Sequence, residues 1–546
     1  MSGKRSRTAP IVLCRLSLCL LLAFGVTACG ARDSRNDTQT AAALRTGEED
    51  GLRTGEEDGL RTGEEDGLRT GEEDGLRTGG EDEARTGGTD TSGIVLGDEQ
   101  FDEYLPLLAG KRVALFSNHT GIVGDRTSAT DHGPSAVSTA TDHGASGIST
   151  ATGFAAPNAS TATDRAFPDA SSALGLVDPD RPFGTDPDGR ETVYGEHILD
   201  ALLSHGVDVT LIFSPEHGFR GTEDAGAAVA DSVDEQTGIP ILSLYGGDGP
   251  LRAARQNTDR FDILVADLQD VGLRYYTYYL TLYSLMDICS TTGRKVLILD
   301  RPNPNGFYVD GPILQERYRS GVGRLPIPIV YGMTWGELAG MINGEGWLSA
   351  GKDACDLTVI PCRNYTHQMK YALIRCPSPN LKDMRAVYLY ASTCFFENTA
   401  MSVGRGTEFP FETFGSPELK GIAGCSFAFT PRSMPGALNP PLRDKTCYGE
   451  DLRTIPLEEI WENGIDPSYL IRAYQAYGRT TGGGSFWGKP DGTGIYWIDR
   501  LSGSDALRTM VEEGKTPEEI KASWQEECRA FREQRKPYLL YEDIAD

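Results

Sequence analysis

The chain has few of the residues that build metal sites. Only 7 histidines occur in 546 residues, none in a tight HxH or HxxxH spacing, and no CxxC pair exists. A structural zinc site is therefore not expected. Basic residues are also scarce, because 52 Lys and Arg compare with 79 Asp and Glu, a net charge of -27. Nucleic-acid phosphates need lysine and arginine. We predict no metal, no cofactor and no nucleic-acid partner.

Long apolar runs are missing except at the start of the chain. Residues 1–28 carry basic side chains and then an apolar stretch. They end in Val26-Thr-Ala28, and Cys29 follows directly. This order is typical of a secretory signal, and the small residues before Cys29 resemble a bacterial lipobox. The alternative is a short membrane anchor, although the stretch is shorter than the ~20 apolar residues that span a bilayer. We expect a lipid-anchored protein of the cell envelope, in the periplasm or at the outer membrane, with Cys29 lipidated.

Residues 29–96 have low complexity. The octad Leu-Arg-Thr-Gly-Glu-Glu-Asp-Gly begins at Leu44, recurs from Leu52, Leu60 and Leu68, and decays from Leu76. The negative charges of successive octads repel one another, and each octad has few apolar side chains to bury. The repeat therefore predicts a disordered acidic linker. A Ca²⁺-binding repeat is the alternative, but the octad lacks the aspartate spacing of calcium loops.

A second biased stretch, residues 125–189, is rich in Ser, Thr, Ala and Asp. We interpret it as an insertion within the folded region. Its His132 and His143 stand in two copies of Ala-Thr-Asp-His-Gly, which favours a spacer role for them over a metal role.

Eight of the 11 cysteines follow the linker, the other three lying in the signal or lipobox. In an exported chain some of them are expected to form disulfides, and the pairing cannot be read from the sequence. The eight are Cys289, Cys355, Cys362, Cys376, Cys394, Cys425, Cys447 and Cys528.

From Lys111 onward, short apolar runs alternate with segments of helical periodicity. This alternation predicts an α/β fold with right-handed crossovers and a Rossmann-like, doubly wound, mostly parallel sheet. No GxGxxG follows the first strand, so no dinucleotide fingerprint is present. The expected strands are 112–116, 207–213, 239–245, 262–268, 295–300 and 357–362, and the expected helices are 195–204, 278–290 and 335–345.

The alternation of apolar runs and helical segments ends near Cys376, and segments rich in Pro and Gly follow. We predict an N-terminal catalytic domain over residues 97–375 and a smaller α+β domain over 376–546 that completes a cleft. Thr516-Pro-Glu-Glu519 is a capping box with proline at the first helical position. A helix is expected after it, with Ile520, Trp524, Cys528 and Phe531 on its buried side.

Titratable residues gather where the predicted strands end. Glu216, His217 and Arg220 follow the apolar run that ends at Phe213. Ligands bind beyond the carboxyl ends of parallel strands. Glu216 has no helical partner at i+4, which favours a catalytic role over an ordinary ion pair.

Three other strand ends carry similar loops. They contribute Asn118 and His119; Asp267, Gln269, Asp270, Arg274, Tyr275 and Tyr276; and Asn303 and Asn305. If the strands are parallel, all these loops open at one edge of the sheet.

Each of these residues also has a structural interpretation. Asn118 or His119 could cap a helix, Asp267 could pair with Arg274, and Asp300 with Arg301. The tyrosines are more often core than sugar platform. In the second domain, Glu397 and Arg405 suit a loop over a ligand, where Arg405 could bind a carboxylate through two bonds; a glycine-rich turn with a surface arginine is the alternative.

Several ordered motifs belong together: Asn118-His-Thr-Gly121, Ser214-Pro-Glu-His-Gly-Phe-Arg-Gly221, Ser243-Leu-Tyr-Gly246, Asp267-Leu-Gln-Asp-Val-Gly272, Asp300-Arg-Pro-Asn-Pro-Asn-Gly306, Pro377-Ser-Pro-Asn-Leu381, Phe396-Glu397, Ser402-Val-Gly-Arg-Gly-Thr407 and Tyr538-Leu-Leu-Tyr541. From about residue 97 to the end, the chain resembles the NamZ-type exo-β-N-acetylmuramidases. The resemblance implies release of N-acetylmuramic acid from non-reducing ends of peptidoglycan fragments, in a cleft between two domains. Glu216 matches the expected catalytic glutamate, and Asn398 stands where glycine is expected.

Glycoside hydrolysis normally uses two carboxyl groups. Glu216 could act as the acid with a raised pKa, with Asp267 or Asp270 as its partner and His217 beside it; alternatively the 2-acetamido group is the nucleophile. Arg274 or Arg405 would suit the lactyl carboxylate. Two rival hypotheses are a metal-dependent phosphoester or amide hydrolase that uses His119, His217, Asp267 and Asp270, and a lipoprotein that binds muropeptides without cutting them.

Overall fold

The computed structural model describes residues 93–124, 195–215, 219, 231–244, 248–373, 375–481 and 486–544. All of them belong to one unit, Arg85–Asp546. The signal, the octads and most of the 125–189 insertion lie outside these residues. Within them, every helix is too short or too polar to cross a bilayer.

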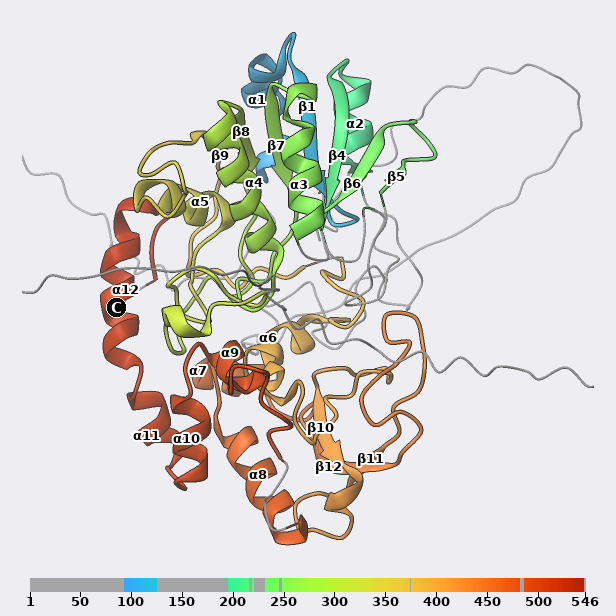
Figure 1. The fold of residues 1–546 in the computed structure, drawn as a ribbon, viewed down its shortest axis with the longest axis vertical. Helices are drawn as coiled ribbons and strands as arrows, with labels where there is room; N and C mark the ends of the chain where they lie inside the picture. The colour runs from blue at the N-terminus through green and yellow to red at the C-terminus, as the bar shows by residue number, and fades with distance from the viewer. Residues whose placement is uncertain are drawn as a thin grey trace, which may run out of the picture. The chain divides into compact units, whose positions relative to one another are not determined.

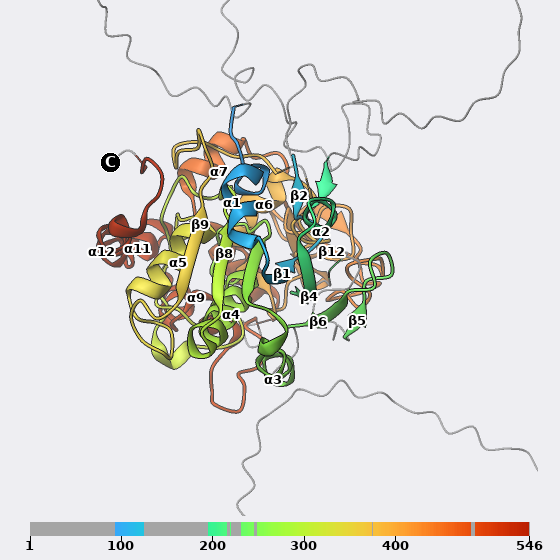
Figure 2. The same cartoon turned by 90° about the horizontal axis from the view of Figure 1, so that it is seen from above.

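The N-terminal part is built on a seven-stranded sheet in the order β5-β6-β4-β1-β7-β8-β9 (Figures 1 and 2). All neighbours are parallel except the short edge strand β5, which is antiparallel to β6. The predicted doubly wound α/β sheet is therefore confirmed. The strands are β1 (Arg112–Ser117), β4 (Asp208–Ser214), β5 (Ser232–Val233), β6 (Pro240–Ser243), β7 (Ile263–Asp267), β8 (Lys295–Leu299) and β9 (Asp356–Ile360), with β2 (Ile122–Val123) and β3 (Glu196–His197) as a separate pair.

Helices cover both faces of this sheet because neighbouring strand residues point to opposite sides. In β1, Phe116 packs in the core that contains α4, whereas Leu115 packs in the core that contains α1 and α2. Both faces are thus buried, which explains the near-continuous apolar strands. The helices of this part are α1 (Phe101–Leu108), α2 (Ile198–Ser204), α3 (Asp248–Gln256), α4 (Tyr278–Thr292) and α5 (Trp335–Gly344).

The C-terminal part has a three-stranded antiparallel sheet and several helices (Figure 1). This agrees with the predicted α+β composition. The strands are β10 (Thr413–Ser416), β11 (Phe427–Phe429) and β12 (Cys447–Asp451), and the helices are α6 (Met384–Thr393), α7 (Leu457–Asn463), α8 (Ser468–Thr481), α9 (Trp497–Ser502), α10 (Ala506–Glu512), α11 (Pro517–Ala522) and α12 (Gln525–Arg535).

The end of the chain packs on the N-terminal part. The Trp524 indole donates to Asp310 at 2.7 Å, and Tyr541 donates to Asp300 at 2.6 Å. The capping box at Thr516 and Glu519 is confirmed. The predicted single helix is two, because α11 ends at Ala522 and α12 begins at Gln525. The segment predicted as the end of the second domain therefore also supports the first.

The eight cysteines of the folded region are all free thiols in the structure, so the expected disulfides are not observed. All but Cys376 are buried. Burial raises the pKa of Cys355 to about 12. Thiol–disulfide exchange requires the thiolate, so apolar packing keeps such thiols unreactive.

Candidate active site

The C-terminal ends of β1 and β7 are adjacent, and Ser117 pairs with Asp267 where the two strands end. In the strand order, β4 and β6 lie on one side of β1, and β7, β8 and β9 lie on the other side. The order of the strands therefore reverses at β1. Ligands bind at such a topological switch point in open α/β sheets. The predicted convergence of the loops at one sheet edge is confirmed for these strands.

The three titratable residues predicted after β4, which are Glu216, His217 and Arg220, lie outside the described residues. Pro215 directly follows β4, and the buried Phe219 ring lies 4.9 Å from the His197 ring, edge to face. The catalytic roles of Glu216 and His217 and the binding role of Arg220 stay predictions.

Asp267 belongs to a buried network of three charged groups. Arg301 donates to it through Nε at 2.6 Å and through Nη2 at 3.1 Å, and the same Nη2 reaches Asp98 at 2.7 Å. The side chains of Asp98 and Asp267 are fully buried, and that of Arg301 is 2% exposed. The partner of Asp267 is thus Arg301, not Arg274 as one interpretation expected. A carboxylate held in this way supports the site and does not fit direct attack on a sugar.

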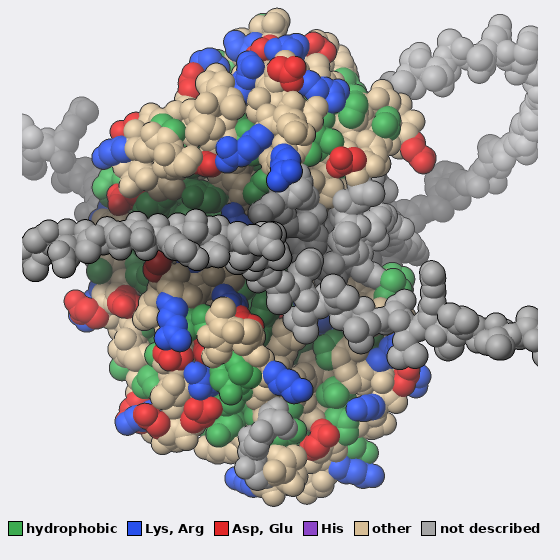
Figure 3. All heavy atoms as spheres, viewed as in Figure 1, with side chains coloured by type: hydrophobic (Ala, Val, Ile, Leu, Met, Phe, Trp, Pro, Cys, Tyr) green, Lys and Arg blue, Asp and Glu red, His purple; other side chains and the backbone are tan. Residues whose placement is uncertain are grey.

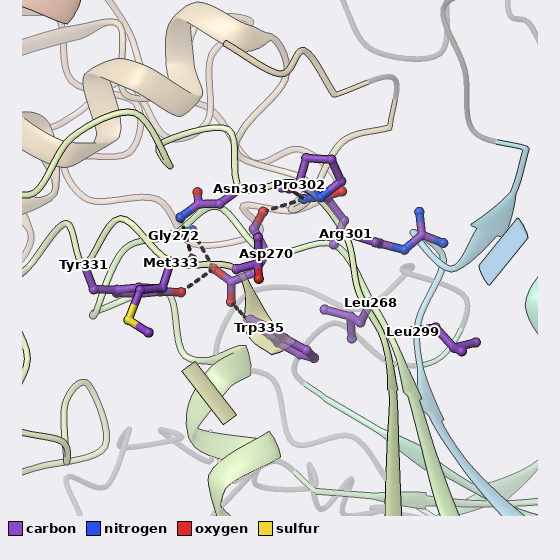
Figure 4. Close-up of a pocket in the computed structure, with 12 residues that line it drawn as sticks. Leu268, Asp270, Gly272, Leu299, Arg301, Pro302, Asn303, Tyr331, Met333 and Trp335 are labelled. Carbon is purple, nitrogen blue, oxygen red and sulfur yellow. Dashed lines mark hydrogen bonds between the residues drawn. The ribbon is translucent and has the colours of Figure 1, made fainter. Parts of the chain in front are cut away.

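Asp270 lies in the loop after β7, three residues beyond Asp267, and is also buried. It accepts hydrogen bonds from the Trp335 indole at 2.8 Å, the Tyr331 hydroxyl at 3.2 Å and the Gly272 amide at 2.6 Å. Figure 4 shows its carboxylate directed toward Tyr331 and Trp335, whereas the Arg301 side chain points away from them. Burial raises the pKa of Asp270 to about 6, although these donors oppose the rise.

The cavity beside Asp270 is too small for a sugar. Its volume is about 10 Å³, space for about one water molecule. Asp270 and Asp267 therefore form a buried support below the loops, and the predicted role of either as the second catalytic carboxylate does not fit this position.

The loop after β1 is held from two sides. The Asn118 side-chain oxygen accepts bonds from the Thr120 amide at 2.9 Å and hydroxyl at 2.6 Å, so it closes a turn. The half-buried His119 donates through Nε2 to the Cys376 carbonyl at 2.7 Å. Of the two predicted binding residues, His119 is the more accessible, and it joins the sheet edge to the segment that leads into the C-terminal part.

Gln269, Asn303 and Asn305 are buried and bind backbone. Gln269 donates to the Pro302 carbonyl at 2.9 Å, Asn303 to Met333 at 2.9 Å, and Asn305 to Val271 at 2.9 Å. The bonds of Gln269 and Asn305 join the loops after β7 and β8, and the bond of Asn303 joins the second loop to the segment before α5. The side chains were predicted to bind substrate, and the structure instead gives them a positioning role.

Arg274 occupies the interior, where no substrate reaches it. Its side chain is fully buried and donates to the carbonyls of Pro312 at 2.8 Å, Ile327 at 2.7 Å and Leu501 at 3.0 Å. Burial lowers its pKa to about 10. The expectation that Arg274 binds the lactyl carboxylate is therefore wrong, because backbone carbonyls already hold its guanidinium.

Tyr275 and Tyr276 are also buried, at 4% and 7% exposure. The Tyr275 hydroxyl donates to the Ala391 carbonyl at 2.6 Å, and the Tyr276 hydroxyl donates to the Pro377 carbonyl. The sugar-platform prediction does not fit these positions. The alternative interpretation as core is confirmed, and both rings join the two parts of the protein.

Glu397 and Arg405 are brought together as an accessible pair. Arg405 Nε donates to Glu397 at 2.7 Å, and the side chains are 19% and 24% exposed for Arg405 and Glu397, respectively. The guanidinium lies over the Phe411 ring at 4.9 Å. Its two terminal nitrogens form no hydrogen bond with any described residue, so the fork is open to an anion. This is the arrangement that bidentate carboxylate binding requires.

Asn398 stands where the resemblance predicts glycine, and its backbone conformation accounts for this. Its φ is 60°, in the left-handed region, which asparagine tolerates better than most residues. The turn after Glu397 therefore keeps its shape despite the substitution.

No cluster of three His, Cys, Asp or Glu side chains suited to a metal ion occurs within the described ranges. His119 and Asp270 bind protein groups there. Of the other two members of the metal hypothesis, Asp267 binds Arg301, and His217 is outside these ranges.

Comparison with known protein families shows the family to which this chain belongs. The model of the N-terminal domain of exo-β-N-acetylmuramidase NamZ matches residues 186–385, and that of its C-terminal domain matches residues 388–541. The chain belongs to the NamZ family. It is 32% identical over 381 residues to the peptidoglycan β-N-acetylmuramidase NamZ of Bacillus subtilis strain 168, covering 65% of this chain and 86% of that protein.

Two solved structures from Bacteroides fragilis NCTC 9343 share the fold of this NamZ family member. Both are DUF1343 family proteins, and each match covers 82% of this chain and 99% of the other. One is 43% identical with a TM-score of 0.61. The other is 22% identical with a TM-score of 0.58, which supports the fold alone.

Two supporting residues were missed by the sequence reasoning, and a third was recognised only in part. Asp98 precedes the strands and carries no motif, and Trp335 is an aromatic residue at the start of a helix. Asp300 was noted only as a partner of Arg301, yet it accepts from Thr334 at 2.6 Å and from Gly336 at 2.8 Å. Of these three residues, only Asp300 had a feature in the sequence that could have predicted its role, namely its position at the end of a strand.

Proposed function

We propose that this protein is an exo-acting β-N-acetylmuramidase that releases N-acetylmuramic acid from the non-reducing ends of peptidoglycan fragments. The observation that carries the proposal is the match of both NamZ domain models to one chain. The named activity of the Bacillus subtilis relative is consistent with it.

Glu216 is proposed as the general acid that protonates the leaving oxygen. It follows the apolar strand β4 at the switch point of the sheet. A carboxyl group beside apolar surface has a raised pKa and can hold a proton near neutral pH. His217 and Arg220 are proposed to contact the sugar from the same loop.

Arg405 is proposed to bind the lactyl carboxylate that distinguishes muramic acid from glucosamine. Glu397 holds its Nε, which leaves the terminal nitrogens to form two parallel bonds to a carboxylate. Glu397 is thus a positioning residue for Arg405, and His119 is a further candidate contact because it is half-buried at the sheet edge.

The nucleophile of the first displacement is proposed to be the substrate's own 2-acetamido group, and not a second carboxylate. Asp267 and Asp270 have their oxygens in bonds to buried donors. In this route the acetamido oxygen attacks C1 as the protonated aglycone oxygen leaves, and water then opens the cyclic intermediate. Two inversions at C1 predict retention, so NMR of fresh product should show the β-anomer first; the α-anomer first would contradict this route.

The activity itself is tested by mass analysis of products from peptidoglycan, with and without prior digestion by an endo-acting glucosaminidase. That digestion creates non-reducing muramic acid ends. Free N-acetylmuramic acid should appear only after it. Absence of the free sugar in both digests would contradict hydrolysis, and would favour a binding lipoprotein if the fragments were retained. Activity lost with a chelator would favour the metal-dependent alternative.

We also propose that Cys29 carries a lipid that anchors the protein in the cell envelope. The Val26-Thr-Ala-Cys29 sequence after an apolar stretch supports this. Cys29→Ala should move the protein from the membrane fraction to the soluble fraction, and an unchanged distribution would contradict the anchor.

A further inference from the structure

The helix α12 lines a cavity that plays no part in the proposed reaction. The cavity has a volume of about 360 Å³, and its walls come from α12 and the last described residues. Both ribbon views place α12 at the outer edge of the fold (Figures 1 and 2). This volume is in the range of small-molecule sites.

Basic side chains dominate this cavity. Arg529, Arg532, Arg535 and Lys536 line it together with Glu533 and Asp543. These lining residues carry four positive and two negative charges, and the neighbouring Glu526 pairs with Arg529, so the local excess is +1 in a chain whose net charge is -27. The spacing of three to four residues puts the basic groups on one face of the helix. On the molecular face in Figure 3, by contrast, acidic and basic side chains are interspersed.

Arg535 is fixed within the wall. Its side chain is fully buried, and it donates to the Gly332 carbonyl at 2.8 Å and to Asp543 at 2.5 Å. Its Nε has no hydrogen-bond partner among the described residues. Burial lowers its pKa; the carboxylates of Asp543 and Glu337 oppose this shift, and the like charge of Arg532 adds a smaller lowering effect. A bound anion would relieve this repulsion.

Arg532 supplies the accessible charge. It is half-buried, and it forms no hydrogen bond or ion pair with any described residue. A cation in the last turn of a helix is favoured by the helix dipole. That effect explains one surface arginine, but it does not explain a second, buried arginine beside the first at a cavity.

We propose that this cavity is a binding site for a phosphate-class anion, held by Arg532 with Arg535 and Lys536 behind it. Guanidinium forks match the oxygens of phosphate in pairs. The local excess of positive charge favours an anion, and the volume leaves space for an attached glycerol or sugar. The anion could come from a lipid headgroup, which is a phosphodiester, or from a free phosphomonoester.

The test measures thermal unfolding of the full chain with 10 mM inorganic phosphate against chloride at equal ionic strength. If the dissociation constant is about 1 mM, the midpoint should rise by about 2 °C. Arg532→Gln should abolish the rise. Arg479→Gln is the matched control, because Arg479 is an exposed arginine in the last turn of α8, and it should keep the rise.

A second measurement is independent of stability: the ³¹P line of phosphate should broaden with wild type and with Arg479→Gln, and not with Arg532→Gln. No response of wild type, or an equal response of Arg532→Gln in both measurements, would overturn the site. Glycerophosphoglycerol and glycerol 3-phosphate are compared in the same assays. Stronger binding of the diester assigns a lipid headgroup, and stronger binding of the monoester assigns a free phosphate compound.

Discussion

The candidate site residues divide into a buried support at the sheet edge and an accessible pair in the C-terminal part. Asp267 and Arg301 are almost completely shielded from solvent, whereas Arg405 and Glu397 are partly exposed. The sequence does not distinguish the two groups, because a polar residue in a loop can either face a ligand or fix the loop. The burial of each side chain separates the two roles.

Arg405→Lys should impair substrate recognition. Lysine keeps the charge but cannot form two parallel bonds to a carboxylate. We expect KM for a MurNAc–GlcNAc disaccharide to rise about tenfold with kcat within about threefold, and the preference over a GlcNAc-terminated analogue to fall. Steady-state kinetics on both disaccharides provide the measurement. A fall in kcat at constant KM would show that Arg405 acts in the chemical step.

Arg301→Met should strongly destabilise the protein. It would leave Asp98 and Asp267 buried without their guanidinium, and breaking a buried ion pair costs about 3–5 kcal/mol. The control is Arg255→Met, which removes an exposed pair with Asp287 and should change stability by less than about 1 kcal/mol. Urea unfolding of both variants measures the difference, and equal effects would contradict the proposed support.

At the scale of elements, the start of α5 fixes two strand-end loops. Thr334 and Gly336 bind Asp300, and Trp335 binds Asp270. Burial raises the pKa of Asp300 to about 6, as it does that of Asp270. The loops after β7 and β8 therefore share one anchor, which holds the sheet edge in place.

Stability should consequently rise as pH falls from 7 to 5. The folded pKa of each carboxyl lies above its unfolded value, so its charged form destabilises the fold at pH 7, and protonation removes this effect between about pH 6 and 4. Each group should contribute about 1 kcal/mol between pH 7 and 5. Asp270→Asn should reduce the change measured by urea unfolding at both pH values. The same pH dependence in the variant would contradict the raised pKa of Asp270.

The turn after Glu397 gives a second test at this scale. Asn398 is exposed and has a φ of 60°, so Asn398→Val should destabilise by about 1–2 kcal/mol. Asn398→Gly should be neutral or slightly stabilising, since glycine has no Cβ. Equal loss in both variants would mean that the asparagine side chain, and not the backbone conformation, matters.

At the scale of the molecule, the sequence predicted the architecture well. The alternating pattern specified the parallel sheet and its strands because both faces of each strand are buried. It could not specify which polar partner each buried group has. Arg301 pairs both with Asp267 and with Asp98, which comes from a segment before the sheet, and such pairing depends on tertiary contacts. The same limit applies to Arg274, whose carbonyl partners include Leu501 in the C-terminal part.

The central claim is that Glu216 is the acid of a glycosidase at the switch point of the sheet. The most direct test is the rate of MurNAc–GlcNAc cleavage by Glu216→Gln, compared with Glu408→Gln as a control at a carboxylate that is 81% exposed. The account predicts a loss of about 10²–10⁴-fold for Glu216→Gln and little change for Glu408→Gln, with the unfolding midpoint of both retained. Cleavage by Glu216→Gln at the wild-type rate would contradict it.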